Sequence, residues 1–246
     1  MKLVCDIGVW REIFEALKQV GFMEYEFEFR KDKVIGMEFD ASRVLCVVTE
    51  IDVDLFDKYE LEVEPRRARF DVMWTCKVLK TFPKKEKYII TINNQFKAVS
   101  LTGRRRLISF SLLLPSNLEM FNPDEALEEQ KAIKINSKVM VDELIDGVKQ
   151  GMLFGDNVKL MMSDNEVLVA GTSEKGTSLM SFIKTVSKMK EFESTFKADL
   201  LLNVLKACRK VSRDAVVGIG NNSPIRVIVT KEKLKMKFYL APVIEG

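Results

Sequence analysis

The 246-residue sequence contains no histidine. Without an imidazole, the chain cannot use Ser-His-Asp or Cys-His nucleophilic catalysis, a two-histidine zinc helix or an imidazole proton shuttle. Glycine is scarce, at 12 residues, and neither a G-x-x-x-x-G-K-[ST] loop nor a G-x-G-x-x-G turn occurs, so a phosphate-cradling loop is not expected. Carboxylate or lysine chemistry remains possible, but these absences favour a binding or scaffold protein without a cofactor over an enzyme.

Cysteine pairs and long apolar runs are missing as well. Four cysteines, Cys5, Cys46, Cys76 and Cys208, stand singly with no C-x-x-C pair, which predicts neither a metal site nor a disulfide framework. No apolar run approaches the roughly 20 residues of a membrane span, and the first residues lack the apolar core of a signal peptide. We therefore expect an intracellular protein of the cytoplasm or nucleoid, in a reducing compartment, with no membrane partner.

The composition is that of an ordinary globular protein. Apolar residues make up 47% of the chain and charged residues 30%, while the formal net charge is only +3. The net charge alone therefore does not predict a charged partner, and only the distribution of charge along the chain can indicate one.

Hydrophobic periodicity predicts the same order of elements twice. In the first half we expect a strand, a helix, three strands, a helix and three strands, at residues 2–5, 9–20, 25–29, 34–39, 44–51, 71–82, 88–92, 96–101 and 107–114. A polar segment with prolines follows, and the second half repeats the order at residues 132–136, 137–150, 158–163, 166–172, 177–183, 198–211, 216–219, 225–230 and 235–240.

This order predicts an α+β fold of two similar domains, each with antiparallel sheets and two helices on one face. We place the N-terminal domain at residues 1–114, a connecting linker at 115–131 and the C-terminal domain at 132–246.

Lysines and arginines recur on the outward faces of the four expected helices. At 100° per residue, basic residues on each helix fall on a shared face, most cleanly on the second helix of each half, where the opposite face is apolar. Glu15 and Asp142 mix the charge on the two first helices. Although exposed helix faces often carry lysine for solubility, four basic faces in a near-neutral chain favour a phosphate-facing surface that binds duplex DNA without reading its sequence.

Three segments carry a resemblance to a known family. They are Lys77-Val78-Leu79-Lys80 on the second helix, Met37 to Val44 before it, and the C-terminal Tyr239-Leu240-Ala241-Pro242-Val243-Ile244-Glu245. The chain closely resembles the DNA sliding clamp, the proliferating cell nuclear antigen family of archaea and eukaryotes. The tail is the most specific motif, and the duplicated layout and length agree throughout.

The resemblance implies a DNA clamp fold assembled into a pseudo-sixfold trimeric ring, with basic helices around duplex DNA. Such a ring is a polymerase processivity factor, not an enzyme; a clamp loader opens it, and it tethers DNA polymerase, flap nuclease and DNA ligase through short anchor peptides. The channel residues would be Arg11, Lys18, Lys77, Lys80, Lys138, Lys149, Lys206, Arg209, Lys210 and Arg213.

The resemblance also implies a partner-peptide pocket under the linker and beside the tail. Its residues would be Phe39, Arg43, Val44, Cys46, Met120, Phe121, Pro123, Pro224, Tyr239, Ala241 and Pro242. Arg43 stands where the family usually has a histidine, so we expect an acidic residue beside the anchors to favour binding here.

Subunits are expected to join edge to edge, because two apolar strands would otherwise invite aggregation. Pairing of the strand at 107–114 with the strand at 177–183 of the next subunit would satisfy their backbone groups. The residues assigned to this interface are Ile108, Phe110, Leu112, Thr177, Leu179, Ser181 and Ile183.

Other interpretations stay open at this level. The chain could be one subunit of a heterotrimer, including a checkpoint-type clamp, or a monomeric nucleic-acid binder that uses aromatic stacking. A carboxylate enzyme using Glu24, Glu26 and Glu28, or Asp52, Asp54 and Asp57, is disfavoured, because the period of two would put these glutamates on the solvent face of a strand.

Overall fold

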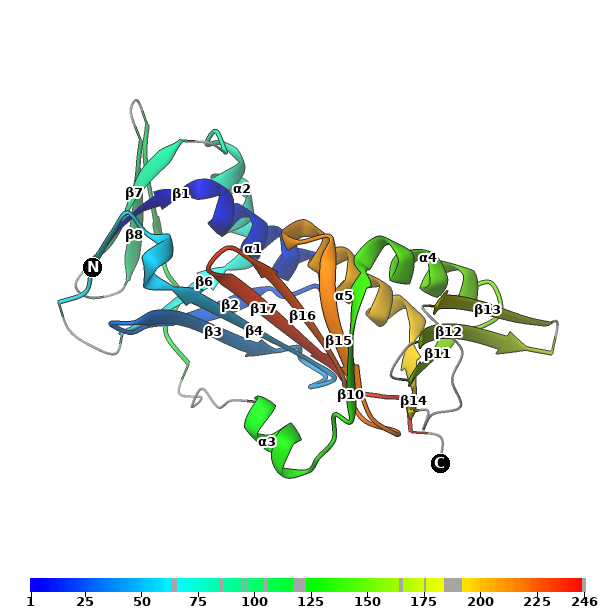
Figure 1. Cartoon of the computed structure of the whole chain (residues 1–246). Helices are drawn as coiled ribbons and strands as arrows, with labels where there is room; N and C mark the ends of the chain where they lie inside the picture. The colour runs from blue at the N-terminus through cyan, green and yellow to red at the C-terminus, as the bar shows by residue number, and fades with distance from the viewer. Residues whose placement is uncertain are drawn as a thin grey trace. The chain divides into compact units, whose positions relative to one another are not determined.

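The computed structural model describes the chain except residues 63–65, 85, 94, 96, 104–105, 117–122, 164–165, 175, 184–191 and 245–246. The chain forms two compact units. Unit 1 comprises Met1–Asp40, Val47–Glu119 and Thr230–Met236, and unit 2 comprises Ala41–Cys46, Met120–Val229 and Lys237–Gly246. Both combine helices with antiparallel strands (Figure 1), as expected of the α+β class.

Unit 1 contains most of the elements from the first half of the chain. They are β1 (Lys2–Asp6), α1 (Ile7–Gln19), β2 (Glu24–Phe29), β3 (Lys33–Phe39), β4 (Leu45–Asp52), the 3-10 turn η1 (Val53–Leu55), β5 (Lys58–Glu60), β6 (Arg66–Asp71), α2 (Val72–Lys80), β7 (Lys87–Ile92), β8 (Ala98–Thr102) and β9 (Leu107–Ser111). Neighbouring strands run in the orders β5-β1-β7-β8-β9 and β4-β3-β2-β6. The register places Leu3 opposite Ile90 and Phe27 opposite Ala68.

Unit 2 repeats this plan after a short helix, α3 (Pro123–Glu129). Its elements are β10 (Ile135–Met140), α4 (Val141–Gly151), β11 (Asn157–Ser163), β12 (Glu166–Ser173), β13 (Gly176–Ile183), β14 (Phe192–Lys197), α5 (Ala198–Val211), β15 (Asp214–Ile219), β16 (Ile225–Lys231) and β17 (Leu234–Leu240). The orders β10-β15-β16-β17 and β13-β12-β11-β14 match β1-β7-β8-β9 and β4-β3-β2-β6 of unit 1. The predicted duplication is confirmed.

In each unit two long helices pack side by side, α1 with α2 and α4 with α5 (Figure 1). The core of unit 1 is aromatic: Trp10 of α1 meets Phe27 of β2 with ring centroids 5.3 Å apart, and Phe14 of α1 meets Phe70 of β6 at 5.5 Å. Both contacts are edge-to-face, the arrangement that the charge distribution of aromatic rings favours. None of the described helices is long and apolar enough to cross a membrane.

Helix α4 begins later than its periodicity predicts. Residues 137–140, expected in the helix, continue β10, and Lys138 pairs with Val216 of β15. Met140 precedes the helix without a side-chain cap, although Ser137 is a favoured capping residue. Sheet pairing has therefore overridden the local helix signal, and Lys138 does not lie on a helix face.

Several further elements differ from the expectation. Strands β5, β6 and β14 were not predicted, and α3 lies inside the segment predicted to be an irregular linker. Strand β9 ends at Ser111 rather than at residue 114, and shortly beyond its end the N–H of Leu113 donates to the carbonyl of Arg69 of β6.

Candidate nucleic-acid and partner sites

In unit 1 the clearest basic surface is the outward face of α2. Asp71 caps this helix by accepting a hydrogen bond of 2.7 Å from the Trp74 N–H. The inward side chains, such as Cys76 and Leu79, are buried, while Lys77 and Lys80 are exposed and no acid lies on the helix. This arrangement leaves two lysine charges available to an anion.

Helix α1 is less suited to binding an anion. Its Arg11 is half-buried and pairs with Glu15 at 3.2 Å, whereas Lys18 is exposed in the last turn. Burial raises the pKa of the Cys76 thiol, and the charge of Lys18 opposes that rise. Lys18 therefore lies near α2, and its charge can add to the α2 surface.

In unit 2 the corresponding basic surface is on α5. Arg209 and Lys210 are exposed in its last turn and Lys206 is half-buried, opposite a buried apolar stripe. Arg209 forms an ion pair with Asp142 of α4. Arg213 lies beyond the end of α5, where its carbonyl accepts a hydrogen bond of 2.8 Å from the Val141 N–H.

Helix α4 does not carry the basic face predicted for it. Its acids are Asp142, Glu143 and Asp146, and its one basic residue, Lys149, pairs with Asp146 at 3.6 Å. Lys138 is exposed, but on strand β10. The basic surface is therefore concentrated on α2 and α5 rather than spread over all four long helices.

Unit 2 brings together most of the residues predicted to bind partner peptides. The N–H of Ala241 donates to the carbonyl of Val44 at 2.9 Å, which joins the C-terminal tail to the 41–46 loop. Arg43 is exposed, with a positive φ of 56°. Val44, Ala241, Pro224 and Pro242 are half-buried and could form a rim.

Other residues of the predicted peptide site lie deeper or elsewhere. Tyr239 is only 5% exposed and Cys46 4%, so they can form a floor but not an open surface. Pro123 is buried in the first turn of α3. Phe39 is half-buried at the end of β3, in unit 1, and Met120 and Phe121 lie outside the described residues.

Beside Tyr239 is an ionic cluster that the sequence did not suggest. Asp124 of α3 accepts hydrogen bonds from Arg226 of β16 at 2.7 Å and from Lys237 of β17 at 2.9 Å. Burial acts to raise the pKa of Asp124, but the two cationic donors hold it below its usual range. These contacts connect residues more than 100 positions apart (separations of 102 and 113), so no local signal reveals them.

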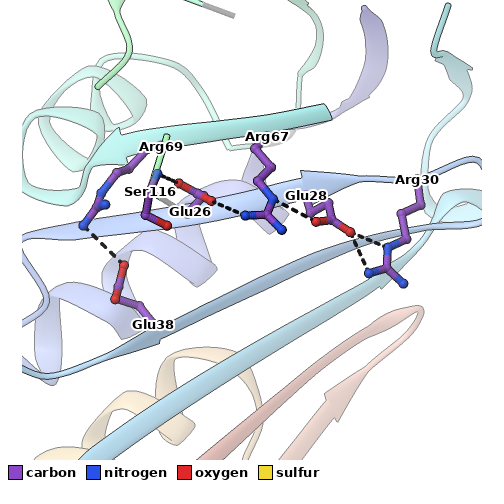
Figure 2. Close-up of polar contacts among 7 residues, drawn as sticks. All are labelled: Glu26, Glu28, Arg30, Glu38, Arg67, Arg69 and Ser116. Atoms are coloured by element: carbon purple, nitrogen blue, oxygen red, sulfur yellow. Dashed lines mark hydrogen bonds and ion pairs between the residues drawn. The ribbon is translucent and has the colours of Figure 1, made fainter. Parts of the chain in front are cut away.

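Two of the three glutamates of β2 are buried, contrary to the expectation, whereas Glu24 at the start of the strand is exposed. Glu26 is 2% exposed and Glu28 3%, and Figure 2 shows the side chains that contact them. Glu28 accepts from Arg67 Nε at 2.9 Å and lies 2.6 Å from an Arg30 guanidinium nitrogen, while Glu26 accepts from the Ser116 N–H at 2.5 Å. Burial acts to raise the pKa of Glu28, but the two arginines hold it below its usual range.

The aspartates considered as catalytic acids form ion pairs as well. Asp57 likewise pairs with Lys87 at 2.6 Å, and Asp52 with Lys233 at 3.7 Å. Within the part of the chain that the structure describes, no group of three His, Cys, Asp or Glu side chains could hold a metal ion.

Strands β9 and β13 are the edges predicted to join subunits. In the sheet orders β9 pairs only with β8, and β13 only with β12, among the described strands. Leu107 is 68% exposed and Leu179 61%, while Ile108 and Phe110 are half-buried. Thr177 is exposed, Leu112 is buried beyond the end of β9, and the side chains of Ser181 and Ile183 lie outside the described part.

No family model matches the chain, but several known proteins are similar to it over most of its length. The DNA polymerase sliding clamp of Pyrococcus furiosus is 23% identical over 233 residues, 90% of each chain. DNA polymerase sliding clamp 2 of Sulfurisphaera tokodaii is 24% identical over 225 residues, 89% of this chain and 90% of the relative.

Solved structures agree along almost the whole chain. PCNA from Thermococcus kodakaraensis matches with a TM-score of 0.82 at 18% identity, covering 98% of this chain and 99% of the other. A. fulgidus PCNA with the C-terminal region of FEN-1 bound gives 0.80 at 14%, covering 100% and 99%, and a PCNA2-PCNA3 complex from Sulfolobus tokodaii gives 0.78 at 19%, covering both chains fully (100%). The shared fold and the similar relatives confirm the resemblance inferred from the sequence motifs.

Proposed function

We propose that this chain, which has the sliding clamp fold, is a subunit of a ring that encircles duplex DNA and holds replication and repair enzymes on it. The observation that carries the proposal is the duplicated fold, in which β9 and β13 are each an edge strand among the strands that the structure describes. A chain with two different edges can join copies head to tail, and such contacts close into a ring when the rotation allows. The role is that of a scaffold without catalysis of its own.

Duplex DNA is held through its phosphates. Lys77 and Lys80 on α2, and Lys210 on α5, are exposed cations on helix faces. No described base-reading loop accompanies them, and phosphate contacts carry no sequence information. Lys18, Lys206, Arg209 and Arg213 add to this surface, whereas Arg11, Lys138 and Lys149 contribute less because of their pairing or position.

Partner enzymes bind at the peptide site of unit 2. The half-buried Val44, Pro224 and Ala241 are the expected rim, and the buried Tyr239 the expected floor, for one aliphatic and one aromatic anchor, which bind by filling a desolvated pocket. The A. fulgidus clamp binds the C-terminal region of FEN-1; by analogy, flap nuclease, polymerase and ligase peptides, and the clamp loader, are the expected partners here.

The ring contains three subunits, either three copies of this chain or this chain with related ones. The PCNA2-PCNA3 complex of Sulfolobus tokodaii shows that one chain of this fold can assemble with another. A checkpoint-type ring is a variant of the same proposal.

The test is the molar mass in solution, measured for the chain alone and mixed with each related clamp chain of the same genome, followed by polymerase processivity on primed circular DNA. We expect a mass near three chains in one of these settings and longer products when that assembly is present. A monomer in every mixture, with no effect on the polymerase, would overturn the proposal.

A further inference from the structure

Helix α3 is held to the rest of unit 2 by a half-buried carboxylate. The helix spans Pro123–Glu129, directly after residues 117–122, which the structure does not describe. Asp124, in its first turn, has a side chain only 15% exposed. A carboxylate with so little access to water needs charged or hydrogen-bonding partners, because removing an ion from water is unfavourable unless the ion is paired.

Each oxygen of the Asp124 carboxylate accepts a hydrogen bond from a different cationic side chain. Arg226 Nη1 of β16 donates to Oδ1 at 2.7 Å, and Lys237 Nζ of β17 donates to Oδ2 at 2.9 Å. The two cations are 15% and 11% exposed, so water screens these contacts little. Arg226 is itself oriented by a second bond, from Nη2 to Asn136 Oδ1 of β10 at 3.0 Å.

The Asp124 contacts are next to the floor of the peptide site. Lys237 and Tyr239 are two residues apart on β17, so they point to the same face of the strand. Burial raises the pKa of the Tyr239 phenol and the Asp124 carboxylate raises it further, which places the hydroxyl close to that carboxylate. Two residues later, Ala241 makes the bond to Val44 that joins tail and loop.

We propose that Asp124 is a positioning residue for the peptide site: its contacts with Arg226 and Lys237 hold α3 against β16 and β17, so that α3 is in place beside Tyr239 before a peptide arrives. The inference rests on the proposed function. A helix already ordered in the free protein lowers the cost of ordering on binding, which is the general benefit of preorganisation.

The test compares Asp124→Asn with Glu128→Gln, which removes the same charge from an exposed position of the same helix. For both variants we measure the hydrogen exchange of residues 123–129, the affinity for a synthetic peptide with one aliphatic and one aromatic anchor, and the molar mass. We expect Asp124→Asn to speed hydrogen exchange in α3 and to weaken peptide binding about tenfold, while the molar mass of the protein stays unchanged. Asp124→Glu should restore part of the peptide affinity. Glu128→Gln should resemble the unaltered protein.

If Asp124→Asn does not fold, Arg226→Gln tests the same contact from the other side. We expect it to speed hydrogen exchange in α3 as well. Faster exchange in α3 with unchanged peptide affinity would overturn the positioning role, as would slow exchange in Asp124→Asn. Tighter peptide binding by Asp124→Asn would show that α3 covers the site instead of building it. If the unaltered protein bound no peptide, both the peptide site and the positioning role of Asp124 would be refuted. Molar mass and DNA retention would still test the ring independently.

Discussion

The buried Glu28 is the residue whose loss should cost unit 1 most stability among its charged groups. Replacing Glu28 with Ala leaves the guanidinium groups of Arg30 and Arg67 without their main partner. Because both arginines keep partial access to water, we expect a loss of about 2 kcal/mol, less than the roughly 3–5 kcal/mol that breaking a fully buried ion pair costs. Denaturant unfolding measures it, and Glu24→Ala, at a more exposed glutamate of the same strand, should cost well under half as much.

The same residue predicts a pH dependence. Its pKa is lower in the folded protein than in the unfolded chain, where about 4.3 is usual. The stabilisation is therefore present above the unfolded pKa and is lost as pH falls through the folded pKa. The difference in unfolding free energy between the unaltered protein and Glu28→Gln should be constant near neutrality and shrink below about pH 4. A difference independent of pH would contradict the ion-pair explanation.

Thr75 of α2 illustrates the opposite case, a buried polar atom that forms no hydrogen bond with the residues that the structure describes. The residue borders a cavity of about 20 Å³ in unit 1, which apolar side chains such as Phe110 of β9 also line. Thr75→Val keeps the shape and removes the hydroxyl, so we expect a gain of up to about 1 kcal/mol in unfolding free energy. Thr75→Ser, which keeps the hydroxyl and loses a methyl group, should instead destabilise the protein.

At the scale of elements, the sequence predicts those with a strong, uninterrupted pattern. Helix α5 matches its predicted range, since Leu201, Val204, Leu205 and Cys208 repeat at helical spacing. The start of α4 was wrong because Ser137 to Met140 pair with β15, a partner about 75 residues away that no local window contains. Strand β14 was missed although Phe192, Ser194 and Phe196 alternate toward one face.

The candidate sites show the same limit. The exposed lysines of α2 and α5 follow from helical period alone, because one helix determines its own face. The burial of Glu26 and Glu28 depends on arginines of β6 and on the Ser116 backbone, 90 residues from Glu26. The Asp124 contacts depend on two strands still further along the chain. Long-range ion pairs of this kind leave no local sequence signal.

The helix faces make an element-scale prediction about DNA. Charge reversal of Lys77 and Lys80 on α2, and of Lys206 and Lys210 on α5, should weaken retention on duplex DNA equally for all sequences. The slope of log affinity against log salt should fall by about 0.9 for each DNA phosphate that the protein no longer neutralises. The matched control is Lys149→Glu on α4, a lysine already paired with Asp146, which should change little. Unaltered retention in the fourfold variant would contradict the assignment of these faces.

At the scale of the whole molecule, the free edge of β9 is expected to close the ring. The N–H of Leu112 donates to Lys97, so alternation directs the backbone groups of Ser109 and Ser111 away from β8, toward the free edge. Ser109→Pro therefore removes an outward donor without breaking the β8–β9 ladder, and proline is tolerated on edge strands. We expect a folded protein with the mass of a monomer, whereas Ser109→Ala should assemble normally. An assembled Ser109→Pro variant would refute the β9 interface.

Encirclement of DNA is the central claim, and a comparison of circular with linear DNA tests it most directly. The assembled protein is loaded on nicked circular duplex, washed in high salt, and the retained fraction is measured before and after a single cut linearises the circle. High salt suppresses phosphate contacts, so only a closed ring stays on the circle, and it slides off the ends of the linear form. We predict retention on the circle and loss on cutting; equal retention on both forms, or loss from both, would contradict the account.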